Sequence, residues 1–384
     1  MPHSEPTPVL LANDSYHSVL AAVRALRAAG YAPWLAVNES GTYSARSRAK
    51  AGTVPVPDPR LDREGFVRGL AAAAARLSVA AVLPTAEHHL LALAGREADF
   101  AGIPLGVPPR ESVELATHKD LLPELAAEAG LHTPPTKKII RGDSEAVGLF
   151  GFPAIVKPLR SQIQNPDGTM VQHSSRYVTS ERVREVLDGL PDGEGLLQPY
   201  ISGKLHSVSG VCWEGELVCA MHQVSIRLWP LRTGGSSYAE TVPPNPELER
   251  GIGRLMRELR WSGLFQAQFV STPGGEHYLI DLNPRTYGSL ALAVAAGLNL
   301  PGIWLSLLLG RRPYVDGYRV GVRFRNEEKD LLALTRMLRN GERLGALRGF
   351  VPRRDTTHAI FSLRDPVPLL TSVEKLPGQV RRSR

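Results

Sequence analysis

The stretch that decides the fold is HYLIDLNPRTYGS, residues 277–289, which follows the strand-like segment GLFQAQFV, residues 263–270. It opens with aromatic and aliphatic residues of the kind that β-strands favour. Because successive side chains of a strand point to opposite faces, the alternation predicts that Leu279, Asp281 and Asn283 share one face. A carboxylate and a carboxamide are therefore expected to point the same way.

Turn residues join the two segments, since STPGGE, residues 271–276, would close an antiparallel hairpin. In the register that we predict for this hairpin, Gln266 lies opposite Asp281 and Gln268 lies opposite Leu279. Both glutamines then share the face that carries Asp281.

Mg²⁺ binds oxygen ligands. When phosphate oxygens and water complete its coordination shell, the protein ligands carry little total charge. Gln268, Asp281 and Asn283 are accordingly our predicted metal ligands. Arg285, just beyond the strand, presents a planar fork of donors to phosphate or carboxylate. Each residue also has a plainer interpretation: Asn283-Pro284 opens turns, Asp281 suits an exposed edge strand, and Arg285 suits a solvated surface.

Taken together, the string from Asp281 to Arg285 resembles the ATP-grasp superfamily, whose last nucleotide-binding strands end in an acidic-x-Asn-Pro-Arg motif that holds Mg²⁺ against ATP. The upstream pair Gln268-Phe269 is similar to the variant in carbamoyl-phosphate synthetases, where glutamine replaces the first carboxylate ligand. The resemblance implies ATP and Mg²⁺, or Mn²⁺, as cofactors. The ligand set has one formal negative charge where many relatives have two.

The chain of 384 residues is long enough for two or three domains, and its composition is that of an ordinary α/β enzyme. No apolar run approaches the roughly 20 residues of a membrane helix. The first residues lack the regions of a signal peptide, so we expect a cytoplasmic protein. Cys212 and Cys219 flank a predicted hairpin turn without partners at metal spacing, and we expect them to be buried, reduced thiols.

The net charge of +7 raises the question of a nucleic-acid partner. From Arg311 onward, basic residues exceed acidic ones by more than the excess of the whole chain. That region lacks aromatic residues between the basic ones and has no nucleic-acid-binding signature. We therefore interpret it as a solvated basic face and expect no nucleic-acid partner.

Residues 1–115 alternate strand and helix as a doubly wound sheet requires, beginning with a predicted strand over residues 8–12. No GxGxxG motif follows that strand, so a dinucleotide site is unsupported. The loops after the strands carry Asn13, Asp14 and Thr85. These are either helix caps or contacts to a second substrate.

From Leu115 the pattern changes to a helix, a proline-rich connector and strands, which resembles the start of the ATP-grasp core. In that core one lysine stands at a helix start and another on an apolar strand that ends in Lys-Pro. Lys119 and Lys157 occupy these positions, and the resemblance implies that both bind phosphates. The physical case is better for Lys157, because an ammonium at the end of the run FPAIV needs an anionic partner. For Lys119, an ordinary solvated lysine on a helix is an equally good interpretation.

Residues 158–176 are polar where relatives of the fold carry a glycine-rich flap whose amides close over the phosphates. Only Gly168 is present here. Either Arg160, Ser161 and Gln162 take over phosphate contacts, or the flap is longer and mobile, or this is an ordinary exposed loop.

Residues 194–218 resemble the linker between the two halves of the grasp and the strand after it. The resemblance implies that adenine is recognised by the carbonyl of Pro199 and the amide of Ile201, with a side-chain contact from Gln198. It also places His206 on the ribose hydroxyls, although a lone histidine in a strand is commonly structural.

Two further arginines, Arg227 and Arg232, stand around a proline and before a Gly-Gly turn. Guanidinium groups present paired donors to planar anions, so both are predicted to steady an acyl phosphate or a substrate carboxylate. With Arg285, they are our predicted catalytic residues.

The predicted fold class is α/β, with a Rossmann-like pre-ATP-grasp domain, a two-lobed ATP-grasp α+β domain and a small C-terminal appendage. The expected boundaries are 1–115, 116–310 (lobes 116–196 and 197–310) and 311–384. ATP-grasp enzymes mostly make acyl phosphates, so the implied activity is that of an ATP-dependent carboxylate-amine ligase.

Two alternatives stay open: another acceptor at the same site, such as bicarbonate, or an ATP-binding regulatory protein without turnover. The expected partners are small-molecule carboxylates and amines, with amino acids or peptides among the options. No membrane is expected, and a homodimer is left open.

Overall fold

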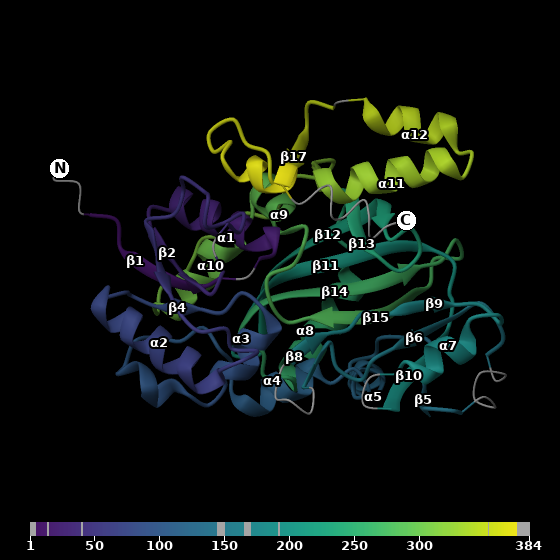
Figure 1. Ribbon diagram of the computed structural model, residues 1–384, viewed down its shortest axis with the longest axis horizontal. Coiled ribbons are helices and arrows are strands. Elements are labelled where there is room, and N and C mark those ends of the chain that lie inside the picture. The colour runs from purple at the N-terminus through teal and green to yellow at the C-terminus, as the bar shows by residue number, and fades with distance from the viewer. Residues whose placement is uncertain are drawn as a thin grey trace.

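The computed structural model describes residues 5–13, 15–39, 41–143, 150–164, 170–190, 193–351 and 353–374. These residues form three large sheets and one two-stranded hairpin sheet, joined and covered by helices (Figure 1). The α/β fold class predicted from the sequence is confirmed.

The first sheet, in the purple and blue N-terminal region of Figure 1, has only parallel strands. Its strand over residues 8–12 is almost wholly buried, which explains why the run PVLLA is apolar without alternation. In sheet order the strands are β3 (Gly52–Pro55), β2 (Ala32–Val37), β1 (Pro8–Ala12) and β4 (Val82–Leu83). The helices of this region are α1 (His17–Ala28), α2 (Arg63–Arg76), α3 (Glu87–Leu93), the short 3₁₀ helix η1 (Glu97–Phe100) and α4 (Arg110–Thr117).

A second, antiparallel sheet forms the small lobe, and it follows helix α5 (Leu122–Glu128). In sheet order its strands are β5 (Lys137–Ile140), β10 (Glu194–Pro199), β6 (Ala154–Lys157) and β9 (Arg176–Val178), and helix α7 (Val183–Asp188) packs on it.

A separate hairpin of β7 (Gln162–Gln164) and β8 (Met170–Gln172) stands where the flap is predicted. The Met170 amide donates to the Arg60 carbonyl at 3.1 Å, so the hairpin contacts the N-terminal region. Gly168, the single glycine of the predicted flap, lies outside the described residues.

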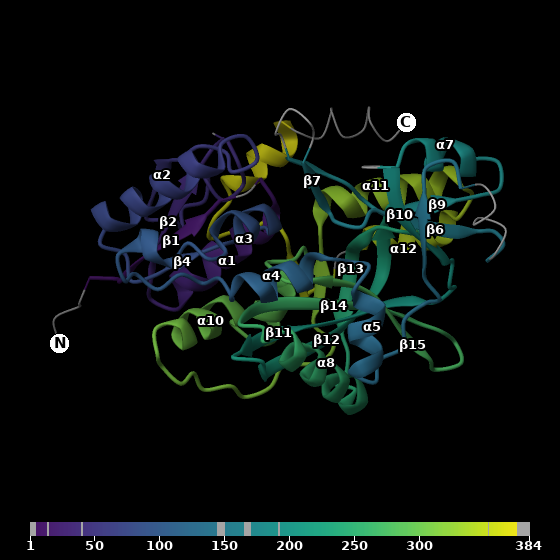
Figure 2. The same cartoon turned by 90° about the horizontal axis from the view of Figure 1, so that it is seen from below.

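The third sheet runs through the centre of the molecule in Figure 1 and has seven strands. In sheet order they are β15 (His277–Asn283), β14 (Gly263–Ser271), β11 (Lys204–Trp213), β12 (Glu216–Trp229), β13 (Gly235–Thr241), β16 (Arg323–Arg325) and β17 (Thr356–His358). Helix α8 (Pro246–Glu258) covers one face of this sheet beside α5 (Figure 2). The predicted hairpin turn between β14 and β15 is confirmed, as is the turn between Cys212 and Cys219, which are buried and free.

The register of β14 and β15 differs from our prediction. Gln268 pairs with Asp281 and Gln266 with Asn283, whereas Phe269 pairs with Leu279. A β-bulge therefore leaves Ile280 as an extra residue of β15. Bulges interrupt the strict alternation of a strand, and the sequence pattern of β15 does not reveal this one.

The bulge also corrects the predicted face of Leu279. Directly paired residues share a face, so Leu279 points with Phe269 into the core beneath α8. Asp281 and Asn283 point to the opposite face together with Gln268. The face predicted for the two polar side chains is thus right, and the one predicted for Leu279 is wrong.

The C-terminal region is drawn in yellow-green above the central sheet in Figure 1. Its strands β16 and β17 extend that sheet, and helices α11 (Glu327–Arg339) and α12 (Arg343–Phe350) lie beside it. The last quarter of the chain is thereby continuous with the sheet that carries Asp281. The predicted domain boundaries remain predictions.

Helices α9 (Leu290–Ala296) and α10 (Leu300–Leu308) bury apolar side chains against α1 and the central sheet. Within the described residues, no single helix is long and apolar enough to cross a membrane. Only α9 and α10 taken together pass that criterion, and the two helices are bent by 91°.

Candidate active site

Two adjoining cavities lie on the face of the central sheet that carries Asp281. The first has a volume of about 200 Å³, and its apolar walls come from both lobes, with Ile155 from the small lobe and Leu205 and Val270 from the central sheet. Gln198, Pro199 and Ile201 line its edge, at the connection between the lobes. An apolar slot with a few polar groups at its edge suits a flat heterocycle.

The second cavity, of about 230 Å³, shares Gln268 and Asp281 with the first and is lined mainly by polar side chains. Its other walls include Asn283 and Arg285 from the end of β15, and Lys119. The arrangement joins an apolar slot to a polar, cationic cavity, with Gln268 and Asp281 where the two meet and Asn283 in the polar cavity.

Asp281 is the electrostatic centre of the site. Lys119 Nζ lies 3.1 Å from Asp281 Oδ1, and both side chains are largely buried. Burial alone would raise the pKa of the carboxyl group, but the charges of Lys119, Lys157 and Arg285 outweigh it and lower the pKa. Asp281 is therefore held ionised, and an ammonium group occupies one side of it.

Lys157, at the end of β6, reaches across to the bulge in β15. Its Nζ donates to the Ile280 carbonyl at 2.6 Å. Ile280 is the extra residue of the bulge and lies outside the regular pairing of β14 with β15. The bulge therefore makes its carbonyl available as this acceptor. Burial lowers the pKa of Lys157 to about 8, with Asp281 opposing and Lys119 adding to the shift. The structure thus brings Lys119, Lys157 and Asp281 together, as a phosphate site requires.

The predicted magnesium ligands share one face of the hairpin, and their polar atoms are linked. Asn283 Nδ2 donates to Asp281 Oδ2 at 3.3 Å, and Arg285 Nη2 donates to Asn283 Oδ1 at 3.0 Å. Among the described residues, no cluster of three His, Cys, Asp or Glu side chains is placed to hold a metal. The one carboxylate and the amide oxygens therefore fit a Mg²⁺ ion that takes most of its ligands from phosphate and water.

Two of the predicted residues do not reach the cavities. His206 pairs with Phe269 on the α8 side of the sheet, and its Nε2 lies 3.1 Å from His222 Nδ1. Burial, followed by the charge of His277, lowers the pKa of His206 to about 4. Arg227 forms a two-pronged ion pair with the buried Asp330 of α11, at 2.7 and 2.9 Å.

His206 and Arg227 lie outside the cavities for different physical reasons. His206 lies one position from Leu205 and Ser207, and a shift of one residue moves a side chain to the other face. Arg227 has its charge matched by Asp330 in the C-terminal region, which the sequence does not show to be adjacent. By contrast, Arg232 lines the first cavity, where its guanidinium lies 4.7 Å from the centre of the Tyr177 ring.

Gln198 is buried, and its Nε2 donates to Thr136 Oγ1 at 2.8 Å.

The three polar residues predicted to replace the flap contacts line two different cavities. Ser161 lines the second cavity, whereas Arg160 contacts His118 and, like Gln162, lines a different and larger cavity.

The strand-end loops of the N-terminal region are structural where the structure describes them. Thr85 Oγ1 donates to the Ala12 carbonyl at 2.6 Å, and Asn13 Nδ2 donates to Thr42 Oγ1 at 3.1 Å. Asp14 lies outside the described residues. Neither Asn13 nor Thr85 lines the two cavities of the candidate site.

Sequence reasoning missed Glu87, the first residue of α3. Burial raises the pKa of Glu87, while Arg285 and Lys119 oppose the shift, so this carboxyl group lies near the cationic end of the site. In the part of the chain that the structure describes, Glu87 Oε1 is buried without a hydrogen-bond partner. The sequence signal for Glu87 is the loop PTAEHH, residues 84–89, which also contains Thr85.

The fold thus places an apolar and a polar cavity where the small lobe faces the central sheet, an arrangement that suits a nucleotide. A family described as "ATP-grasp in the biosynthetic pathway with Ter operon" matches residues 193–329. The carbamoyl phosphate synthase large chain of Halobacterium salinarum is 24% identical over 279 residues, which are 65% of this chain and 26% of that protein. The chain thus spans about a quarter of the length of this relative.

Solved structures share the fold at low sequence identity. An N5-carboxyaminoimidazole synthetase from Staphylococcus aureus in complex with ADP has a TM-score of 0.62 and 12% identity, covering 91% of this chain and 90% of that one. An L-amino acid ligase from Bacillus licheniformis has a TM-score of 0.58 and 13% identity, covering 79% of this chain and 74% of that one. The family model over residues 193–329 and these solved structures together identify the ATP-grasp fold in this chain.

Proposed function

We propose that this protein is an ATP-dependent carboxylate-amine ligase. The observation that carries the proposal is the junction of the apolar and the polar cavity at Asp281 and Gln268, with Lys119, Lys157 and Arg285 around it. Phosphoryl transfer needs alignment and charge neutralisation more than covalent help from the protein. Three cations at one junction supply that neutralisation.

In the proposed reaction, a carboxylate oxygen of the acid attacks the γ-phosphorus of ATP, and ADP leaves. The nitrogen of an amine then attacks the acyl carbon, phosphate leaves with the carboxylate oxygen, and the nitrogen loses a proton. Lys119 and Lys157 hold the phosphates, while Arg285 and Arg232 neutralise the transferring group and the acyl phosphate. Bound Mg²⁺, or Mn²⁺, supplies further charge neutralisation, held by Gln268, Asp281 and Asn283.

For the nucleoside, we propose that the backbone of Pro199 and Ile201 and the side chain of Gln198 contact adenine, since all three line the apolar cavity. His206 has no place in this assignment. The L-amino acid ligase among the structural neighbours makes amino acids the first amines to test. The reduced thiols and the need for ATP suit a cytoplasmic enzyme, and a homodimer is compatible with the proposal.

Oxygen transfer is the most direct test. With an acid labelled with ¹⁸O in its carboxylate, one ¹⁸O should appear in the released phosphate, as measured by mass spectrometry. The comparison is the same mixture without amine or with EDTA. ADP release without ¹⁸O transfer would refute the acyl-phosphate route.

The same assay separates the alternatives. The match to a carbamoyl phosphate synthase makes bicarbonate a specific competitor as acceptor. ADP release with bicarbonate as the single acceptor would favour that reaction. Binding of an ATP analogue without ADP release from any mixture would favour a regulatory protein.

A further inference from the structure

We propose that Lys329, together with Tyr16, binds a second anionic group of the acid substrate, so that the enzyme acts on small dianionic acids. The inference rests on the proposed function and adds the class of acid to it. Lys329 comes from the first turn of α11, in the C-terminal region whose role the sequence leaves open.

The location of Lys329 separates it from the nucleotide. Lys329 and Tyr16 line the second cavity and are absent from the walls of the first, whereas Gln268 and Asp281 line both. Lys329 Nζ lies 2.9 Å from the Tyr16 hydroxyl and 5.3 Å from the centre of the Tyr16 ring. This pair thus borders the polar cavity and not the apolar slot.

The charges around this cavity call for more than one anion. Its walls carry the cations Lys119, Arg285 and Lys329, and among its described lining residues Asp281 is the one carboxylate. Asp281 is already matched by Lys119 at 3.1 Å. Phosphates of ATP and the reacting carboxylate are the partners of the cations near Asp281. Lys329 has no ion pair with a carboxylate among the described residues, so a further anionic group suits it.

The carboxylates next to Lys329 in the chain have other partners: Glu327 accepts backbone amides and Glu328 accepts from the Tyr43 hydroxyl. Burial, followed by the charge of Lys329, lowers the pKa of His17 to about 3, so His17 is neutral and adds no competing charge. His17 Nε2 lies 3.0 Å from the Gly288 carbonyl, which borders the same cavity. The Ser236 hydroxyl also lines the cavity and can donate to carboxylate or phosphate oxygens, whereas the Ser289 hydroxyl already donates to Gln223 Oε1 at 2.8 Å.

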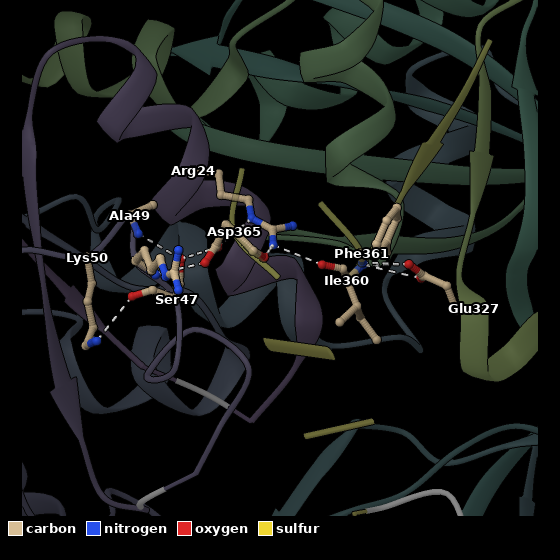
Figure 3. A network of polar contacts seen from close by, with 9 residues as sticks. Arg24, Ser47, Ala49, Lys50, Glu327, Ile360, Phe361 and Asp365 are labelled. Carbon is tan, nitrogen blue, oxygen red and sulfur yellow. Dashed lines mark hydrogen bonds and ion pairs between the residues drawn. The ribbon is translucent and has the colours of Figure 1, made fainter. Parts of the chain in front are cut away.

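The first turn of α11 is held firmly, so Lys329 is positioned rather than loosely exposed. Asn326 caps the helix by accepting from the Lys329 amide, and the Tyr43 hydroxyl donates to Glu328 Oε1 at 2.7 Å. Glu327 accepts the amides of Ile360 and Phe361, the latter at 2.7 Å (Figure 3).

The segment that carries Ile360 is itself tied to the N-terminal region. Asp365 accepts from Arg24 Nε at 2.9 Å and from Ser47 Oγ at 2.6 Å, and Arg24 also donates to the Ile360 carbonyl at 2.9 Å (Figure 3). The C-terminal region is therefore built into the wall of the candidate acceptor cavity, with Lys329 as the side chain that it contributes.

Matched acids test the proposal. With mixed amino acids present as amines, ADP release is measured with succinate and glutarate and with their monomethyl esters, which keep the reacting carboxylate and lose the second charge. For wild type, kcat/KM should be at least about tenfold higher for a diacid than for its monoester. Lys329→Met should abolish that difference through KM for the diacid, with KM for ATP unchanged. Lys329→Arg should retain most of it.

Lys137→Met is the matched control, because Lys137 is exposed and lines neither cavity. Tyr16→Phe should weaken diacid preference less than Lys329→Met does. Equal use of diacid and monoester by wild type, or an equal loss for both in Lys329→Met, would overturn the proposal.

A binding measurement separates this proposal from the ligase reaction. Calorimetric titration of succinate and glutarate into the protein with Mg²⁺ and a non-hydrolysable ATP analogue requires no turnover. Absence of ADP release with every acid would refute the ligase assignment alone, provided that the diacids still bind in a Lys329-dependent manner. Diacid binding that Lys329→Met leaves intact would refute the role of Lys329 alone.

Discussion

The two faces of the central sheet use the same strands for opposite purposes. On the face beneath α8, Phe269 and Leu279 are almost completely buried in an apolar core. On the other face, Gln268 and Asp281 line both cavities of the candidate site. Adjacent positions of one hairpin thus line either the core or the candidate site, and we expect substitutions on the two faces to affect stability and activity separately.

The largest effect is expected at Asp281. Asp281→Asn keeps the shape but removes the charge that organises Lys119, Lys157 and Mg²⁺, so ADP release should fall by about 10²–10³-fold. Steady-state ADP release with Mg²⁺ measures this. Asp99→Asn, at an exposed ion pair with Arg96, should leave the rate unchanged. An Asp281 variant of normal activity would remove the site from this face.

Phe269→Ala tests the opposite face. Truncating a fully buried phenylalanine should lower the free energy of unfolding by about 3–5 kcal/mol, because it leaves a cavity beneath α8. Urea unfolding measures the loss, and ADP release per folded molecule should stay close to that of wild type. Loss of activity at unchanged stability would break the division between the two faces.

Lys157 should make nucleotide affinity depend on pH. Because its pKa is lowered to about 8, the protein without nucleotide loses this charge as the pH rises through about 8. Affinity for ATP should then fall by up to about tenfold per pH unit. Lys157→Arg should bind ATP with little change over the same range, since arginine stays charged. Calorimetry at a series of pH values distinguishes the two.

The smallest effect is expected at His222, beneath the sheet. Burial, followed by the charges of His206 and His277, lowers its pKa from 6.5 to about 3. The unfolded chain therefore binds more protons than the folded protein below about pH 6.5, and stability falls as the pH falls. The loss should be about 1 kcal/mol per pH unit for this residue. Urea unfolding of wild type and His222→Gln at two pH values, near 7 and near 5.5, should show a flatter dependence in the variant.

Much of the fold follows from local pattern, because apolar runs and turn residues act over short distances. The strand Pro8–Ala12 and the hairpin turn of residues 271–276 are where the sequence predicts them. The convergence of Gln268, Asp281 and Asn283 was also predicted. It survives the wrong register because the bulge and the misjudged pairing both leave these side chains on one face.

The remaining errors at the site concern partners distant in sequence. Arg227 and Arg232 look alike along the chain, and what separates them is Asp330, more than a hundred residues away. Lys329 is likewise an ordinary charged helix residue until the fold brings it to the polar cavity. Sequence pattern predicts which face a side chain occupies, but it does not predict which distant charge lies opposite it.

The bulge at Ile280 gives strand β15 a phase shift, with consequences for insertions and deletions. Up to Leu279 the strand is in phase with the core, and from Asp281 it is in phase with the cleft. Deleting Ile280 would restore regular alternation, so that either Leu279 leaves the core or Asp281 and Asn283 turn away from the cleft. Ile280 thereby determines which side chains of β15 face the core and which face the cleft.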